Sequence, residues 1–208
     1  MKTRFEINIF EICFAMSLLI MIFFNISCTD NSDNDTVELN DILSQHQQLI
    51  VEGTGISIYS GEDAPNIEGR FAFSPVFLEE SSYESDNPGT FTSDFELEFY
   101  NQTKSGEILA HYWCPEIGAD VLSNYGFVFG TGNRFTVYFE YTDEASNIYG
   151  EAIFTSVIVV SGNVTSSGIS SAEACQIMTD KSDPYDILKP VNNYRYFIDF
   201  DGNAVRID

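Results

Sequence analysis

Positively charged residues are scarce in this sequence. Lys and Arg together number 9 against 32 Asp and Glu, which gives a formal net charge of −23 at pH 7. Nucleic acid is therefore excluded as a partner, because phosphate binding requires a cationic surface. A chain disordered throughout is excluded as well, since hydrophobic residues make up 44% and aromatic residues 14%, enough to form a core.

Motifs of catalysis and metal binding are also missing. No Ser or Cys stands in a Gly-x-Ser-x-Gly elbow, and the two histidines, His46 and His111, are far apart in the sequence. No Cys-x-x-Cys pair is present, so we predict no metal site, no cofactor and no catalytic residues.

One pair of acids matches the requirement of a glycosidase. Glu96 and Glu98 lie on one face of an expected strand, about 7 Å apart, and glycosidases use two carboxylates that flank a sugar. Such pairs arise by chance in so acidic a chain. We therefore predict that the protein is not an enzyme.

The N-terminal segment has the pattern of an export signal. Two cations precede an apolar run from Ile12 to Phe24, which is shorter than the about 20 residues of a membrane span. The run ends at residues 25–28, Asn-Ile-Ser-Cys, and this end resembles the lipobox of bacterial lipoproteins. The resemblance implies that residues 1–27 are a signal peptide and that Cys28 carries the lipid that anchors the protein in the outer membrane. An uncleaved anchor is the alternative.

The following segment, residues 28–41, is acidic and polar and contains no cation. This composition predicts a disordered, solvated tether. Ser32–Asp35 resembles the acidic export signal with which some Gram-negative bacteria send lipoproteins to the cell surface. The resemblance implies surface display, with a periplasm-facing tether as the alternative. Residues 35–37, Asp-Thr-Val, resemble an O-glycosylation site of such bacteria, which makes Thr36 a candidate for that modification.

The remainder, residues 42–208, is predicted to be a single all-β domain with a short N-terminal helix. Apolar residues at helical spacing predict the helix over Asn40–Gln48, and later segments alternate with a period of two, as strands do. About nine strands are expected, at Gly55–Ser60, Arg70–Leu78, Phe91–Tyr100, Glu107–Cys114, Tyr125–Phe129, Arg134–Tyr141, Ala152–Val160, Ile169–Met178 and Tyr194–Phe200.

Short Gly, Asn, Asp and Ser turns join these strands, and no helix long enough for a parallel crossover lies between them. The pattern predicts an antiparallel meander. A calycin-like up-and-down barrel is slightly favoured over a two-sheet β-sandwich, because the hairpins follow one another in sequence.

Five residues of the domain are singled out: two for their thiols, two for their aromatic surface and one for its positive charge. Cys114 and Cys175 form an even pair, which in an oxidising compartment favours a disulfide; two separately buried thiols are the alternative. Trp113, Tyr112 and Arg195 are candidate ligand-facing residues, since the aromatic rings offer stacking surfaces and cations are rare in this chain.

Several marks across the domain resemble a set of uncharacterised surface lipoproteins of Gram-negative bacteria: Ala64–Gly69, the glycine hairpin before Arg134, and the pairs Ser161-Gly162 and Gly168-Ile169. This resemblance implies no particular activity. The favoured function is a non-enzymatic binding or adhesion module at the cell surface, with an extracellular glycan or protein as ligand. A lipocalin-like carrier of a small apolar ligand and an accessory subunit of an envelope complex are the alternatives.

Overall fold

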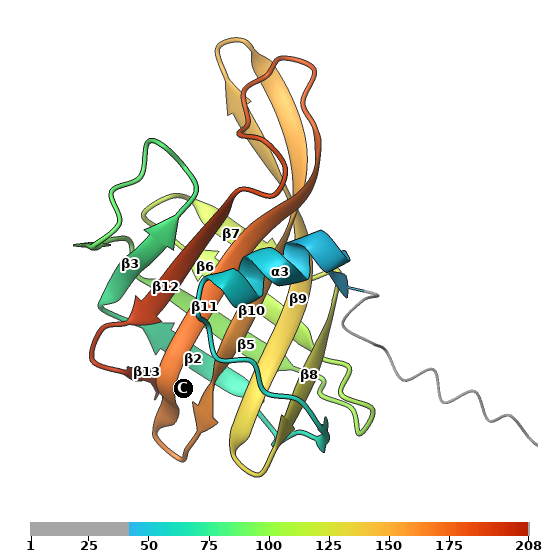
Figure 1. Cartoon of the computed structure of the whole chain (residues 1–208), viewed down its shortest axis with the longest axis vertical. Coiled ribbons are helices and arrows are strands. Elements are labelled where there is room, and N and C mark those ends of the chain that lie inside the picture. The colour runs from blue at the N-terminus through green and yellow to red at the C-terminus, as the bar shows by residue number, and fades with distance from the viewer. Residues whose placement is uncertain (1–41, 208) are drawn as a thin grey trace, which may run out of the picture. The chain divides into compact units, whose positions relative to one another are not determined.

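The computed structural model describes residues 42–207, and these form one helix and thirteen strands (Figure 1). The prediction of an all-β domain is confirmed. The elements are α3 (Gln45–Gly53), β1 (Glu62–Asp63), β2 (Gly69–Phe73), β3 (Val76–Ser81), β4 (Thr90–Phe91), β5 (Phe95–Tyr100), β6 (Leu109–Cys114), β7 (Ala119–Leu122), β8 (Tyr125–Thr131), β9 (Arg134–Asn147), β10 (Gly150–Val164), β11 (Gly168–Ser182), β12 (Tyr194–Asp199) and β13 (Asn203–Ile207).

All thirteen strands belong to one hydrogen-bonded sheet. Its main path runs β1-β8-β9-β10-β11-β13-β2-β5-β6-β7, with β12 paired to β11 and β3, and β4 paired to β3. Every pair is antiparallel except β1 with β8. The predicted signal peptide, the predicted lipid anchor at Cys28, the predicted tether and the candidate Thr36 lie outside the described residues.

The favoured up-and-down barrel is wrong, because the sheet is not closed and its strand order is not sequential. The path ends at β1 and β7. Near these ends, one isolated antiparallel bridge joins Glu107, just before β6, to Phe127 in β8. The order departs from a meander at β11, which pairs with β13 over Gly168–Ser170 and with β12 over Glu173–Ile177. The long strand β11 therefore pairs with both β12 and β13, and the order of hairpins in the sequence does not predict this. A sandwich of two separate sheets is not formed either.

Phenylalanines fill the inner face of the sheet. Phe71, Phe73, Phe99, Phe135 and Phe139 are buried in one cluster. The rings of Phe99 in β5 and Phe139 in β9 meet edge to face with centroids 6.1 Å apart, although their strands are far apart along the sheet path. The sheet therefore curls over its own core.

Helix α3 covers a second apolar cluster on the other face of the sheet. Figure 1 shows α3 lying across β9, β10 and β11, and its side packs on Tyr138, Val159 and Cys175 from these strands. Helix α3 begins at Gln45 because Ser44 caps it, while the first two residues of the predicted helix, 40–41, lie outside the described residues. The Ser44 hydroxyl accepts from the Gln47 amide, and the Gln47 side chain accepts from the Ser44 amide. Within residues 42–207, no helix is both long and apolar enough to cross a membrane.

Two expected strands are divided, and one is not formed. Arg70–Leu78 splits between β2 and β3, where Pro75 has no amide hydrogen to donate, and Phe91–Tyr100 splits into β4 and β5. Gly55–Ser60 is an unpaired extended segment, since its Ser57 and Tyr59 amides donate to the side chains of Glu173 and Thr136 instead. The two splits place the β3–β4 loop beside β12, where it forms a pocket wall.

Candidate functional site

A pocket of about 240 Å³ lies between the β3–β4 loop, β6 and β12. Two of the three residues predicted to face a ligand, Tyr112 and Arg195, line it. The third, Trp113, does not, because neighbouring residues of a strand point to opposite faces of the sheet. The other lining residues are Leu78, Asp86, Asn87, Thr90, Phe91, Thr92, Ser93, Phe95, Cys114, Ile117, Gln176 and Phe197.

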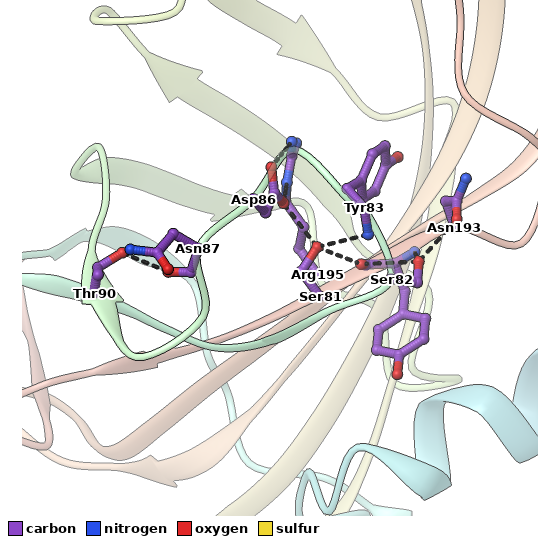
Figure 2. A network of polar contacts seen from close by, with 9 residues as sticks. Ser81, Ser82, Tyr83, Asp86, Asn87, Thr90, Asn193 and Arg195 are labelled. Atoms are coloured by element: carbon purple, nitrogen blue, oxygen red, sulfur yellow. Dashed lines mark hydrogen bonds and ion pairs between the residues drawn. The ribbon is translucent and has the colours of Figure 1, made fainter.

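One wall of the pocket is fixed by a two-point ion pair between Arg195 and Asp86 (Figure 2). Arg195 Nε donates to Asp86 Oδ2 at 2.6 Å, and Nη2 donates to Oδ1 at 3.0 Å. The Ser81 hydroxyl donates to the same carboxylate at 2.7 Å, and the guanidinium lies 4.3 Å from the centre of the Tyr83 ring. The Arg195 guanidinium holds the pKa of Asp86 below its usual value, so the carboxylate is ionised at neutral pH.

The β3–β4 loop is also tied to the start of β12. The Ser82 amide donates to the Tyr194 carbonyl at 3.0 Å, and the Tyr194 amide donates to the Ser82 hydroxyl at 2.8 Å. At the far end of the loop, the Thr90 hydroxyl donates to the Asn87 carbonyl at 2.6 Å (Figure 2). Anchored at both ends, the loop presents a preformed wall, which reduces the ordering cost of binding.

The floor of the pocket is built from uncharged groups. The rings of Tyr112 and Tyr141 stack with centroids 6.2 Å apart, and the Gln176 side-chain amide donates to the Tyr141 hydroxyl. Burial raises the pKa of Tyr112 and of Tyr141, so both phenols keep their protons at neutral pH. Of these residues Tyr112 and Gln176 line the pocket, so they offer it aromatic surface, one amide and a neutral hydroxyl.

The predicted disulfide is not formed: Cys114 and Cys175 are separate buried thiols. Cys114 belongs to the inner cluster, where its thiol donates to the Asp94 carbonyl at 3.3 Å, and Cys175 belongs to the cluster under α3. Strict alternation along their strands predicts that Cys114 shares the face of Ala110 and that Cys175 shares the face of Ile169, both inward. The alternation of β11 is interrupted near Ser171, whose φ is 52° and where the register with β10 shifts, so Ile169 faces inward and Cys175 outward.

Trp113 lies in a second, smaller hollow of about 220 Å³ on the outer face of β2, β5, β6 and β7. The Arg70 guanidinium lies 5.6 Å from its ring centre and pairs with Glu96 through Nε at 2.6 Å. His111 Nε2 lies 2.6 Å from Asp120 Oδ1. Arg70 and Glu96 thus pair across neighbouring strands, so one acid of the candidate glycosidase pair is held by an arginine.

Sequence reasoning missed most of the pocket wall, above all Asp86, Asn87 and Gln176. The only local signal is the Asn87-Pro88-Gly89 turn, which marks a loop but not its partner. Among residues 42–207, no group of three or more His, Cys, Asp or Glu side chains is placed to hold a metal ion.

The chain was compared with known proteins at three levels. No protein-family model, no curated protein and no solved structure matches it.

Proposed function

We propose that this protein is a non-enzymatic binding module of the cell envelope and that it takes a saccharide unit in the pocket between Arg195 and Tyr112. The observation that carries the proposal is the composition of the pocket: a fixed wall with polar side chains stands over an aromatic floor. A sugar has the matching chemistry, since hydroxyl groups surround its edge while its C–H faces are apolar.

Size and charge support a small, neutral ligand. The pocket volume of about 240 Å³ lies below the about 300–1,000 Å³ of sites for larger molecules. The charges of Arg195 and Asp86 offset each other within the pocket. An anionic ligand would in addition meet the repulsion of a chain with a net charge of −23.

The state of the carboxylate supports binding without hydrolysis. Asp86 is the one carboxylate among the residues that line this pocket, and glycosidases need two. Its lowered pKa, caused by the hydrogen bonds from Arg195, keeps it ionised, so it carries no proton to donate to a leaving group at neutral pH.

The buried core supports a ligand at the surface rather than inside the sheet. Phe71, Phe99, Phe135 and Phe139 occupy the interior and pack against one another. A lipocalin-like carrier would need an apolar cavity in that place.

The proposed location depends on the sequence pattern alone. In the proposal, residues 1–27 direct export, Cys28 carries the lipid, and the acidic tether of residues 28–41 leads to the domain and to display on the outer face of the outer membrane. The lipid would then hold the protein permanently in the membrane, whereas the glycan would bind reversibly.

The test is a glycan array probed with the purified protein, followed by titration of the strongest ligand against two variants. Asn87→Ala and Thr92→Val each remove polar atoms from the pocket wall, and we expect each to weaken binding about fivefold, the effect of one hydrogen bond. Thr131→Val at the end of β8, outside this pocket, is the matched control and should leave affinity unchanged. An array without any bound glycan would contradict the proposal.

A further inference from the structure

Three phenylalanines form an aromatic platform beside the pocket mouth, hereafter the Phe platform: Phe77 in β3, Phe91 in β4 and Phe200 in the turn between β12 and β13. Their ring centroids lie 4.9–5.4 Å apart. Phe91 and Phe200 are 57% and 55% exposed. So much exposed aromatic surface in one place is typical of a contact site.

The Phe platform and the pocket share a residue. Phe91 lines the pocket and packs on Phe200, so a ligand leaving the pocket on that side meets the platform at once. The pocket is closed at its inner end, because Phe95 and Cys114 in its floor are only 5% and 1% exposed and belong to the core.

From this arrangement we propose that the site recognises the end of a neutral oligosaccharide chain. The terminal unit enters the closed pocket, and the next unit lies with its C–H face on Phe91 and Phe200. The inference depends on the proposed function, which assigns a saccharide to the pocket. It adds that the ligand is an oligosaccharide, that the oligosaccharide binds by its end, and that the Phe platform contacts the second sugar unit.

Chain ends are required by the closed floor. An internal unit must leave a site on two sides, and here Phe95 and Cys114 block one of them. An acyl chain or an apolar peptide side chain would suit the Phe platform but would leave the polar atoms of Asn87, Thr90 and Thr92 in the pocket facing apolar groups. A saccharide suits both parts of the site.

The experiment is calorimetric titration of the purified full chain with glucose-, galactose-, mannose- and N-acetylglucosamine-based ladders of one to four units. For the series that binds, we expect two units to bind about fivefold more tightly than one, the gain of one added aromatic contact. Longer chains should add nothing further and should still bind one protein per chain.

Variants at Phe200 separate the platform from the pocket. Phe200→Ala should abolish the gain between one and two units and leave the affinity for one unit unchanged, while Phe200→Tyr, which keeps the ring, should retain the gain. Leu122→Ala, at a residue 60% exposed on β7, is the control for loss of an exposed apolar side chain.

The outcomes distinguish the two proposals. Equal affinity for one and two units, affinity that keeps rising with chain length, or several proteins per chain would overturn end recognition while leaving a saccharide site in place. Absence of binding at every length would overturn the proposed function, and binding of an apolar peptide or detergent in place of sugars would overturn both.

Discussion

Arg195 in β12 and Asp86 in the β3–β4 loop form a two-point ion pair although they are 109 residues apart in sequence. Asp86 is well shielded and Arg195 is about one-third exposed. The pair closes a loop of the chain and at the same time positions a pocket wall, so its loss affects both stability and binding.

Replacement of Asp86 should reveal this contribution through its pH dependence. The folded state lowers the pKa of Asp86 below 3.8, mainly through the Arg195 hydrogen bonds, so the stabilisation is present above pH 3.8 and is lost as pH falls through the folded pKa. We expect Asp86→Asn to lower the free energy of unfolding by about 1 kcal/mol at pH 7 and by much less near pH 3. Urea titrations at both pH values measure it, and an equal loss at both would contradict the ion pair.

Asp199 should show the opposite dependence. Burial and the neighbouring Asp201 raise the pKa of Asp199 above 3.8 in the folded state, so the contribution of this carboxyl group to stability is greatest below that value and falls as pH rises toward the raised pKa. Asp201→Asn removes the neighbouring carboxylate. It should stabilise the protein by about 0.5 kcal/mol at pH 7 and have no effect near pH 3. A variant less stable than wild type at pH 7 would refute this account.

The two buried thiols should both titrate as free. In the Cys13→Ser, Cys28→Ala variant, unfolded in guanidinium without reductant, we expect two thiols per chain, and in the native protein we expect very slow reaction because both residues are buried. Burial also raises the pKa of the Cys175 thiol to about 12, so almost no thiolate forms at neutral pH. A reductant should not change the melting temperature. Finding no reactive thiol after unfolding would show that Cys114 and Cys175 form the disulfide after all.

The aromatic core should dominate stability. Phe99 is buried and packs on Phe71 and Phe139, so Phe99→Ala is expected to cost about 3–5 kcal/mol through lost contacts and the cavity left behind. Leu122→Ala on the exposed face of β7 should cost less than about 0.5 kcal/mol. Similar losses in chemical denaturation would show that the curled sheet does not enclose the core described above.

The proposed lipid anchor has its own test. Labelled palmitate supplied to producing cells should enter the wild-type protein and not the Cys28→Ala variant. Removal of the protein from intact cells by external protease would support surface display, and protection behind an intact outer membrane would place it on the periplasmic side. Equal labelling of the variant would end the lipoprotein proposal.

Alternation along single strands could be predicted from the sequence, and sheet order could not. Phe95, Leu97 and Phe99 alternate with Glu96 and Glu98, and the structure buries the apolar set as expected. The neighbours of β11 could not be derived, because the pairing of Gly168–Ser170 with β13 depends on segments more than thirty residues away.

The same distinction explains the outcome at the candidate site. Tyr112 and Arg195 were noticed for their chemistry, yet their meeting with Asp86 and Gln176 depends on how β3, β6, β11 and β12 come together. The orientation of Cys175 was mispredicted for a local reason. An irregularity near Ser171 reverses the faces of the residues that follow it in β11, Cys175 and Ile177 among them, and a period-two pattern carries no sign of it.

The place of β13 between β11 and β2 bears on when this domain can fold. β2 is made early and β11 late, and neither can complete its hydrogen bonds on this side until Asn203–Ile207 arrives to join them. A chain interrupted before that point would leave two open strand edges, so nearly all of the domain must be synthesised before its sheet is complete. This late completion means that a tag or truncation at residues 203–207 would harm folding more than one at the exposed hairpin turns.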